Sequence, residues 1–181
     1  MPMNPLRAQL AAVAAIVVAG DVLTKQVALA SLPAAGMPVE VLGEVVRFTL
    51  AFNKGAAFGM HVGGWSRVIF SLIAFGMVGA LWVIAGRLQA PATRMVIAMG
   101  LVCGGALGNL LDRLRWDRGV VDFIDIGMDA WRFWTFNLAD SAITVGAILL
   151  LLPASESPPA RVASPAAPPA PPAGDSSGQA A

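Results

Sequence analysis

The amino-acid sequence predicts an α-helical integral membrane protein with four transmembrane helices and a small hairpin region outside the membrane. Of its 181 residues, 57% are hydrophobic and only 13% are charged, and this is about half the charged fraction of an average soluble domain. Four apolar stretches also approach the length of about 20 residues that a helix needs to cross a bilayer. We therefore expect one membrane domain, residues 1–152, followed by a tail, residues 153–181.

The first apolar stretch runs from about Leu6 to Ala30 and is interrupted by Asp21 and Lys25. It has an alternative interpretation as a cleavable signal peptide, with Arg7 in the basic region and the last three residues as the cleavage site. Asp21 and Lys25 lie between the apolar core and that site, where signal peptides disfavour charge. We therefore expect a retained helix.

The other three apolar stretches are continuous over most of their length. They run from about Trp65 to Ala85, from about Thr93 to Leu114 and from about Thr135 to Leu152. The third becomes polar near its end, and the fourth contains an aspartate, Asp140, close to its start. Four spans would place both ends of the chain on the same side of the membrane.

Two loops on the other side have the composition of short β-hairpins. Val39–Phe52 is rich in β-branched and aromatic residues around Gly43. Val120–Ile126 and Trp131–Phe136 flank a turn at residues 127–129 and predict a second hairpin. The tail is rich in Pro, Ala and Ser without apolar periodicity, and we expect it to be disordered.

The orientation in the membrane follows from the loops. Lys and Arg usually mark the cytoplasmic side, but here they occur on both sides. The tight turn with Arg87 and Arg94 holds no acidic residue and favours cytoplasmic termini. Four tryptophans would lie on the opposite side, as in an interfacial aromatic belt: Trp65, Trp116, Trp131 and Trp134.

Several polar residues fall at one depth in the predicted helices. With a rise of about 1.5 Å per residue, Asp140 lies about 18 Å from the helix end at Leu152, less than the roughly 30 Å hydrocarbon core. The same rise puts Asp21 and Asn109 about 22 and 21 Å from the starts of their helices. Three helices therefore carry polar groups at a common level towards the outer face. Ionisable residues at such depth usually mark a functional site.

Lys25 and Arg113 follow Asp21 and Asn109 at i+4, on the same helix faces. Either cation also has a simpler interpretation, since Arg113 could pair with Asp112 or extend outward and Lys25 could do the same. Asp122 lies eighteen residues before Asp140. A hairpin of that length returns the chain to its starting face, so the two aspartates can meet.

Two aspartates in a poorly solvated site tend to share one proton. One can then activate a water while the other polarises a carbonyl, which is the chemistry of an aspartic protease. Other nucleophiles lack partners, because the only histidine, His61, is expected in a solvated loop and Cys103 in helix packing. We expect no cofactor.

Two alternatives use the same carboxylates. The first is a small proton- or cation-coupled transporter subunit, although this does not explain why the acids gather in the outer half of the membrane. The second is a metal site with Asp122, Asp125 and Asp140, which lacks suitable histidines. With a net charge of +1 and no basic block, nucleic-acid binding is not expected.

Five short motifs occur in order between residues 6 and 152: Asp21-x-x-x-Lys25, Phe52-Asn53-x-Gly55-Ala56-Ala57-Phe58-Gly59, Gly108-Asn109-x-x-Asp112-Arg113, Val121-Asp122-Phe123 and Phe136-Asn137-x-Ala139-Asp140. This ordered set resembles the lipoprotein signal peptidase family, also called signal peptidase II. The resemblance implies a four-helix aspartic peptidase of the bacterial inner membrane with a small extracytoplasmic β-cradle. Such enzymes remove signal peptides from prolipoproteins, cutting before a cysteine that carries diacylglycerol.

The resemblance also implies roles for individual residues. Asp122 and Asp140 match the catalytic pair. The surrounding residues would orient the acids and hold the substrate: Asn53, Gly55, Asn109, Arg113 and Asn137, with Asp21 and Lys25 as a supporting pair. Termini would be cytoplasmic and the site extracytoplasmic. The expected partners are diacylglyceryl-modified prolipoproteins and membrane lipids, and we expect the chain to act as a monomer.

Overall fold

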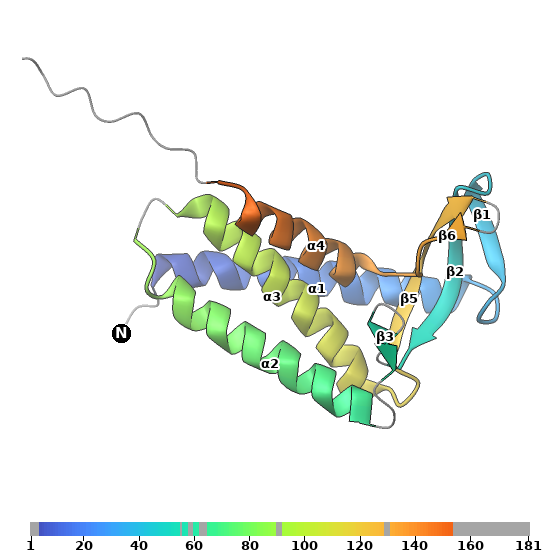
Figure 1. Cartoon of the computed structure of the whole chain (residues 1–181), viewed down its shortest axis with the longest axis horizontal. Helices are drawn as coiled ribbons and strands as arrows, with labels where there is room; N and C mark the ends of the chain where they lie inside the picture. The colour runs from blue at the N-terminus through green and yellow to red at the C-terminus, as the bar shows by residue number, and fades with distance from the viewer. Residues whose placement is uncertain are drawn as a thin grey trace, which may run out of the picture.

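The structure, a computed structural model, describes residues 4–54, 56–57, 60–61, 65–89, 92–128 and 131–153. Four helices form an elongated bundle, and β-strands gather at one end of it (Figure 1). Gly55 and residues 154–181, the greater part of the predicted tail, lie outside the described residues. The mostly helical fold with a small antiparallel sheet confirms the fold class in outline.

In the part of the chain that the structure describes, three helices are long and apolar enough to cross a membrane: α1 (Pro5–Ser31), α2 (Ser66–Ala85) and α3 (Thr93–Arg115). The fourth, α4 (Leu138–Leu151), has 14 residues and is about 21 Å long. It begins three residues after the predicted Thr135, because Asn137 caps it. That this shorter helix also spans the membrane remains a prediction.

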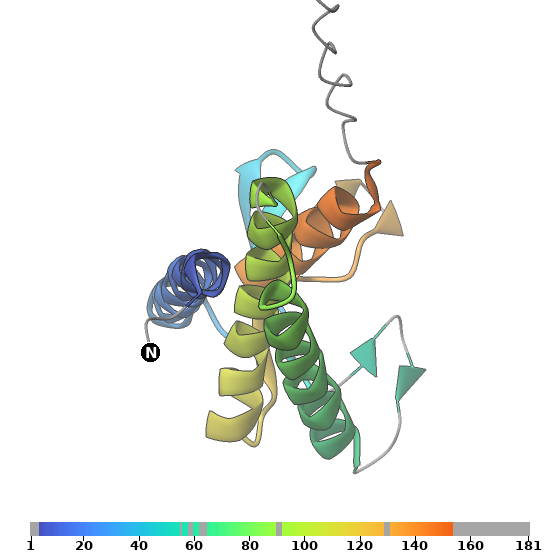
Figure 2. The ribbon, with the colours of Figure 1, turned by 90° about the vertical axis from the view of Figure 1, so that its left-hand side faces the viewer.

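Helix α3 lies between the other three helices and packs against each of them (Figure 2). Glycines on α3 permit this close packing. A Cβ atom at Gly104 would lie 2.6 Å from the Val17 Cβ on α1, and one at Gly105 would lie 2.3 Å from the Ala139 carbonyl oxygen on α4. Neither neighbour could yield without moving its helix, so these glycines fix the distances between the helices.

The larger sheet has four antiparallel strands in the order β1-β2-β5-β6. They are β1 (Pro38–Leu42), β2 (Val46–Asn53), β5 (Val120–Met128) and β6 (Trp131–Arg132). Both predicted hairpins are present, although β6 is shorter than predicted. Pairing of β2 with β5 joins them into one sheet, and two short strands, β3 (Ala56–Ala57) and β4 (Met60–His61), pair separately.

A buried ionic cluster connects three strands of this sheet. Asp125 on β5 accepts hydrogen bonds from the Arg47 and Thr49 side chains on β2, at 3.2–3.3 and 2.9 Å, and from Arg132 Nε on β6 at 2.7 Å. Arg132 also donates to the Glu44 carbonyl oxygen. Asp125 therefore links β2, β5 and β6 through side-chain contacts outside the helical bundle.

The surface of the bundle is apolar along its length. Ile16 and Leu23 on α1, Leu72 and Phe75 on α2 and Leu151 on α4 are all exposed. Their exposed fractions lie between 65% and 85%, whereas the buried interior holds several charged and amide side chains. This inversion of the usual soluble pattern agrees with the membrane class predicted from composition.

Candidate active site

The N-terminus of α4 begins in a capping box made by two polar residues. Asn137 Oδ1 accepts from the Asp140 backbone N–H at 3.0 Å, and Asp140 Oδ2 accepts from the Asn137 backbone N–H at 3.2 Å. The reciprocal pair satisfies backbone donors that the helix itself leaves free. The aspartate that interrupts the apolar stretch therefore starts the helix.

Asn137 also connects α4 to the sheet. Its side-chain nitrogen donates to Asp122 Oδ1 at 2.7 Å and lies 3.2 Å from the Val121 carbonyl oxygen and 3.0 Å from Asn109 Oδ1. Asn137 is fully buried and Asp122 is 3% exposed. One asparagine thus contacts both aspartates of the predicted pair and holds β5 beside the start of α4.

Two further amides contact the aspartates. Asn109 on α3 donates from Nδ2 to Asp140 Oδ1 at 2.7 Å. The Asn53 side chain, at the end of β2, hydrogen-bonds Asp122. Each predicted catalytic carboxylate is therefore oriented by side chains from neighbouring elements.

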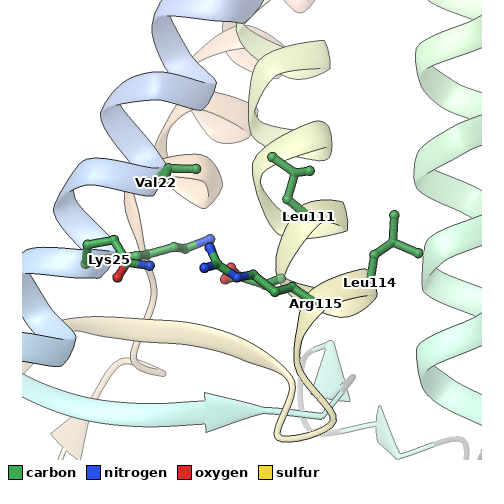
Figure 3. Close-up of a pocket in the computed structure, with 7 residues that line it drawn as sticks. Val22, Lys25, Leu111, Leu114 and Arg115 are labelled. Carbon is green, nitrogen blue, oxygen red and sulfur yellow. The ribbon is translucent and has the colours of Figure 1, made fainter.

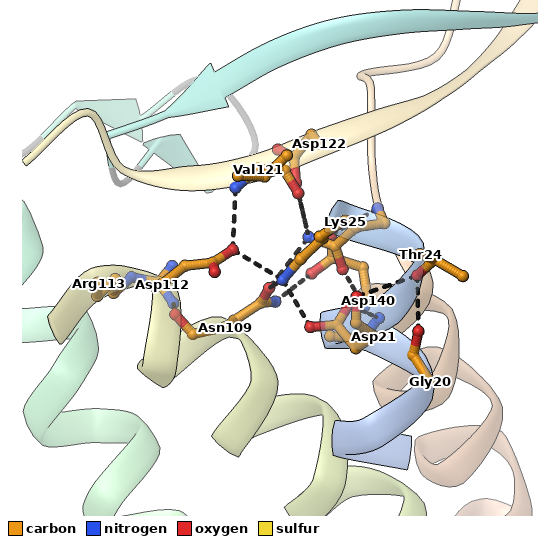
Figure 4. A network of polar contacts seen from close by, with 12 residues as sticks. Gly20, Asp21, Thr24, Lys25, Asn109, Asp112, Arg113, Val121, Asp122 and Asp140 are labelled. Carbon is orange, nitrogen blue, oxygen red and sulfur yellow. Dashed lines mark hydrogen bonds and ion pairs between the residues drawn. The ribbon is translucent and has the colours of Figure 1, made fainter. Parts of the chain in front are cut away.

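Behind the pair lies a buried ionic triad of Asp21, Lys25 and Asp112. Lys25 Nζ lies 2.7 Å from Asp21 Oδ2 and 2.9 Å from Asp112 Oδ2, and it donates to Asn109 Oδ1 at 3.0 Å (Figure 4). The contact with Asn109 is a hydrogen bond, and the two carboxylate contacts are ion pairs. We call the triad together with Asn109, Asp122, Asn137 and Asp140 the polar network.

Arg113 borders the polar network without an ion pair to it. Its Nη1 donates to the Asn109 carbonyl oxygen at 3.2 Å, and its guanidinium carbon lies 5.6 Å from the centre of the Phe70 ring on α2. Buried Arg113 Nε has no hydrogen-bond partner among the described residues. The alternative pairing of Arg113 with Asp112 is wrong, because the Asp112 carboxylate pairs with Lys25 instead.

Burial raises the pKa of Asp122 from its usual value near 4 to about 7, and the nearby Asp140 carboxylate adds to this rise. Hydrogen bonds from Asn137 and Asn53 and the charge of Lys25 act in the opposite direction. A carboxyl with a pKa near 7 is protonated in about half of the molecules at neutral pH. Asp122 can therefore donate a hydrogen bond as well as accept one.

A groove between α1 and α3 borders Lys25 and Asp112 and has a volume of about 440 Å³ (Figure 3). Its other lining residues are Val22, Gln26, Leu111, Leu114 and Arg115. Neither Asp122 nor Asp140 lines it. The groove therefore leads to the ionic triad and does not reach the predicted catalytic pair.

The structure brings together the predicted site residues that it describes: Asp21, Lys25, Asn53, Asn109, Arg113, Asp122, Asn137 and Asp140. Asp112 is the site residue that sequence reasoning did not include. Its spacing of three from Asn109 on one helix face is the signal that could have identified it. Among the described residues no group of three potential metal ligands occurs, and Asp125 contacts arginines instead.

Comparison with known proteins decides the family. Residues 13–155 match the sequence profile of a family described as Signal peptidase (SPase) II. The chain belongs to the signal peptidase II family. The resemblance inferred from the five motifs is thereby confirmed.

Individual relatives support the same assignment. The lipoprotein signal peptidase of Coxiella burnetii (strain RSA 493 / Nine Mile phase I) is 43% identical over 119 residues, 65% of this chain and 72% of that protein. That of Pseudomonas aeruginosa PAO1 is 47% identical over 117 residues, 63% of this chain and 69% of that protein. That of Hydrogenovibrio crunogenus is 40% identical over 141 residues, 77% of this chain and 80% of that protein.

Two solved structures share the fold. Both are described as a bacterial membrane enzyme studied by the in meso method, at 2.3 and 1.9 Å resolution. They are each 34% identical to this chain, with TM-scores of 0.67 and 0.66. The match covers 76% of this chain and 82% and 86% of theirs. The fold is therefore that of a bacterial membrane enzyme, in agreement with the family assigned from sequence.

Proposed function

We propose that Asp122 and Asp140 are the catalytic pair of an aspartic endopeptidase that cuts prolipoproteins immediately before a diacylglyceryl-modified cysteine. Membership of the signal peptidase II family makes the chain an aspartic-type peptidase that removes signal peptides from prolipoproteins. The observation that carries the residue assignment is that Asn137 contacts both carboxylates inside a buried network: its side-chain nitrogen donates to Asp122 and its backbone N–H donates to Asp140. The family gives no support to a transporter.

The surroundings of the two acids suggest which one holds the shared proton. Asp122 has a pKa raised to about 7 and so supplies the protonated carboxyl. Asp140 accepts hydrogen bonds from Asn109 and from the Asn137 backbone, and it lies in the first turn of α4, where the helix dipole favours negative charge. We assign Asp140 as the base and Asp122 as the acid.

The reaction then proceeds in two steps. Asp140 takes a proton from a water whose oxygen attacks the scissile carbonyl carbon, while the Asp122 O–H hydrogen-bonds the carbonyl oxygen and stabilises the developing charge. When the resulting tetrahedral intermediate collapses, the C–N bond breaks and the leaving nitrogen receives a proton from the pair. The pair again carries one proton at the end of the cycle.

Other residues would hold the substrate. The Arg113 Nε donor is buried and lacks a partner among the described residues, so a substrate carbonyl oxygen could satisfy it. Asn53, Asn109 and Asn137 would orient the two acids, and Asp21 and Lys25 would support them from behind. Gly55 keeps its sequence-based assignment, a position where the backbone can approach the substrate closely.

The arrangement of the molecule supports a location in the bacterial inner membrane. The start of α1 and the end of α4 lie at one end of the bundle, and the sheet and the start of α4 lie at the other (Figure 1). Asp122 is on β5 of that sheet, and Asp140 is in the first turn of α4. Apolar helix surfaces between the two ends would contact lipid. We propose cytoplasmic termini, an active site near the extracytoplasmic face and a monomeric enzyme.

The test of this function is cleavage of a purified prolipoprotein in detergent micelles, followed by intact-mass measurement of both products. The diacylglyceryl-modified substrate should yield a product that begins with the modified cysteine. The unmodified precursor, which differs only in the lipid, should be cut at least about tenfold more slowly, because acyl chains position the scissile bond. Equal cleavage of both precursors, or cleavage at another bond, would contradict the proposed substrate.

A further inference from the structure

The residue before each proposed catalytic aspartate donates its backbone N–H to a buried carboxylate. The Val121 N–H, before Asp122, donates to Asp112 Oδ2 at 3.1 Å. The Ala139 N–H, before Asp140, donates to Asp21 Oδ1 at 3.0 Å. The two contacts are equivalent in kind, although one lies at a β-strand and the other in the first turn of a helix.

Lys25 links these two carboxylates. Its ammonium lies between Asp21 and Asp112, at 2.7 and 2.9 Å, and Figure 4 shows the three side chains meeting below the strand that carries Asp122. A continuous chain of contacts therefore runs from the backbone at Asp122, through Asp112, Lys25 and Asp21, to the backbone at Asp140. It runs beside the direct link through Asn137, and Asn109 Oδ1 joins the two because it accepts from both Lys25 and Asn137.

The triad is buried to an extent that makes it costly. Asp21 is 0%, Lys25 2% and Asp112 8% exposed. Charges removed from water lose hydration, and an apolar group of similar size often stabilises a fold as well or better. A buried ionic triad is therefore poorly explained by stability alone, whereas charge-assisted hydrogen bonds hold backbone groups at short, defined distances.

The packing around the triad leaves little freedom. A Cβ atom at Gly108 on α3 would lie 2.5 Å from Asp21 Oδ2, so the carboxylate fits only beside a glycine. The Asp112 carboxylate, on the same helix, is held from the strand side by the Val121 N–H. Helix α3 thus accommodates one carboxylate of the triad and supplies the other.

We propose that Asp112 is a positioning residue for peptide cleavage, and that the Asp21–Lys25–Asp112 triad sets the separation between Asp122 and Asp140. This inference rests on the proposed catalytic pair. Loss of the Val121 contact would let β5 move relative to α4 and would misplace the Asp122 carboxyl. Transition-state contacts would weaken more than substrate binding, so kcat should fall while KM changes little.

The experiment compares Asp112→Ala, Asp112→Asn and the control Asp125→Asn in the micellar cleavage assay. Asp125 is buried to a similar extent, 6% exposed, and is bound to arginines. It lies on β5, the strand that carries Asp122, but it has no contact with the triad. Asp112→Ala should lower kcat by at least about tenfold, given that displacements of about 1 Å can cost 10²-fold. Asp112→Asn retains an acceptor oxygen and should lose less, and Asp125→Asn should keep kcat within about twofold of the wild type.

A second readout separates positioning from general stability. Lys25 favours the ionised form of Asp122, and the carboxylate of Asp112, 2.9 Å from Lys25 Nζ, carries the opposite charge. In Asp112→Asn the Lys25 charge acts with less compensation, so the pKa of Asp122 falls and the alkaline limb of the kcat/KM profile moves to lower pH. Asp125→Asn should leave the limb unchanged.

Wild-type kcat in Asp112→Ala, or an equal loss of kcat in Asp125→Asn, would overturn the proposal. If Asp112→Ala does not fold, Asp112→Asn carries the test through the pH profile, and an unmoved alkaline limb would then contradict it. Asp122→Asn and Asp140→Asn are measured alongside. Cleavage that survives in those two variants contradicts the catalytic pair, whereas their inactivity with normal Asp112 variants contradicts the positioning role alone.

Discussion

At the residue scale, Asp140 has two roles: it caps a helix and it belongs to the proposed catalytic pair. Its carboxylate closes the capping box of α4 with one oxygen and accepts from Asn109 with the other. Asn137 is equally shared, because its oxygen caps the helix and its nitrogen contacts Asp122. Each residue therefore has one role in capping α4 and another in the proposed catalytic site. A substitution that keeps the first role and removes the second should lower activity without destabilising the helix.

Asn137→Ser is such a substitution. Serine is about as good an N-cap as asparagine, so the thermal unfolding temperature should change by only a few degrees. The shorter side chain cannot reach Asp122 Oδ1, so kcat should fall by about 10²-fold, within the range for a lost catalytic positioning contact. Circular dichroism and the cleavage assay measure the two effects, and a normal kcat would contradict the role of the Asn137 nitrogen.

The pH dependence of cleavage should reflect the pair. A catalytic pair that works with one shared proton loses activity when that proton leaves. Because the pKa of Asp122 is raised to about 7, kcat/KM should decline as the pH rises through about 7. Asn53→Ala removes a hydrogen bond that favours ionised Asp122, so its pKa should rise and the alkaline limb should move to higher pH. A limb that moves to lower pH, or an unmoved one, would contradict this assignment.

Helix α3 determines the arrangement at the scale of elements. Its small residues let α1 and α4 approach closely enough for Asn109 to contact Asp140 and for Asp112 to contact Lys25. Gly105 faces the Ala139 carbonyl oxygen and the Ile143 side chain on α4. A larger residue at this position would push away the helix that carries Asp140.

Gly105→Ala should therefore destabilise the protein by about 1–3 kcal/mol, as overpacking of a tight interface does, and should also lower kcat. Gly79→Ala is the matched control, because a Cβ atom there meets nothing within 4 Å. Alanine favours helix over glycine by up to about 1 kcal/mol, so the control should be neutral or slightly stabilising. Thermal unfolding in detergent distinguishes the two. Equal unfolding temperatures would mean that α3 and α4 pack less closely than described.

The sequence predicts helices better than it predicts strand pairing. Long apolar stretches locate α1, α2 and α3 to within a few residues, since lipid-spanning length is a local property. The observed start of α4 differs from the predicted one, because the cap at Asn137 and not the apolar stretch determines where the helix begins. Pairing of Phe52 on β2 with Val121 on β5 connects segments on either side of two helices, and no local pattern encodes it.

At the scale of the whole molecule, the two ends of the bundle differ in chemistry. Arg7 Nε donates to the Trp82 carbonyl oxygen and Arg94 donates to the Leu152 and Pro153 carbonyl oxygens, so arginines close two helix C-termini at the end away from the sheet. Trp65, Trp131 and Trp134 belong to the sheet end and are exposed. The cytoplasmic orientation of the termini expected from the loops stays a prediction.

The orientation predicts a clear outcome for reporter fusions. Green fluorescent protein fused after residue 181 should fluoresce, because it folds in the cytoplasm. Alkaline phosphatase inserted at Gly43, in the turn between β1 and β2, should be active, because it needs an oxidising compartment. An inactive phosphatase at Gly43 together with a dark carboxyl-terminal fusion would reverse the proposed topology.

Depth along a helix made much of the site predictable from the sequence. Asp21, Asn109 and Asp140 share a level because each helix has a fixed rise per residue. The partner of Lys25 was harder to predict, since Asp21 and Asp112 on different helices both contact it. Side-chain partners depend on how the helices rotate against one another, and the glycines of α3 determine that only once all helices are packed.

The central claim is that Asp122 and Asp140 act together in peptide cleavage. Its most direct test is the rate of cleavage of a diacylglyceryl-modified prolipoprotein by Asp122→Asn and Asp140→Asn, compared with Asp125→Asn and with the wild type. Both single variants should fold and insert normally and lose at least about 10³-fold in kcat, as expected when an essential acid or base is removed. Cleavage at near wild-type rates by either variant would contradict the catalytic pair.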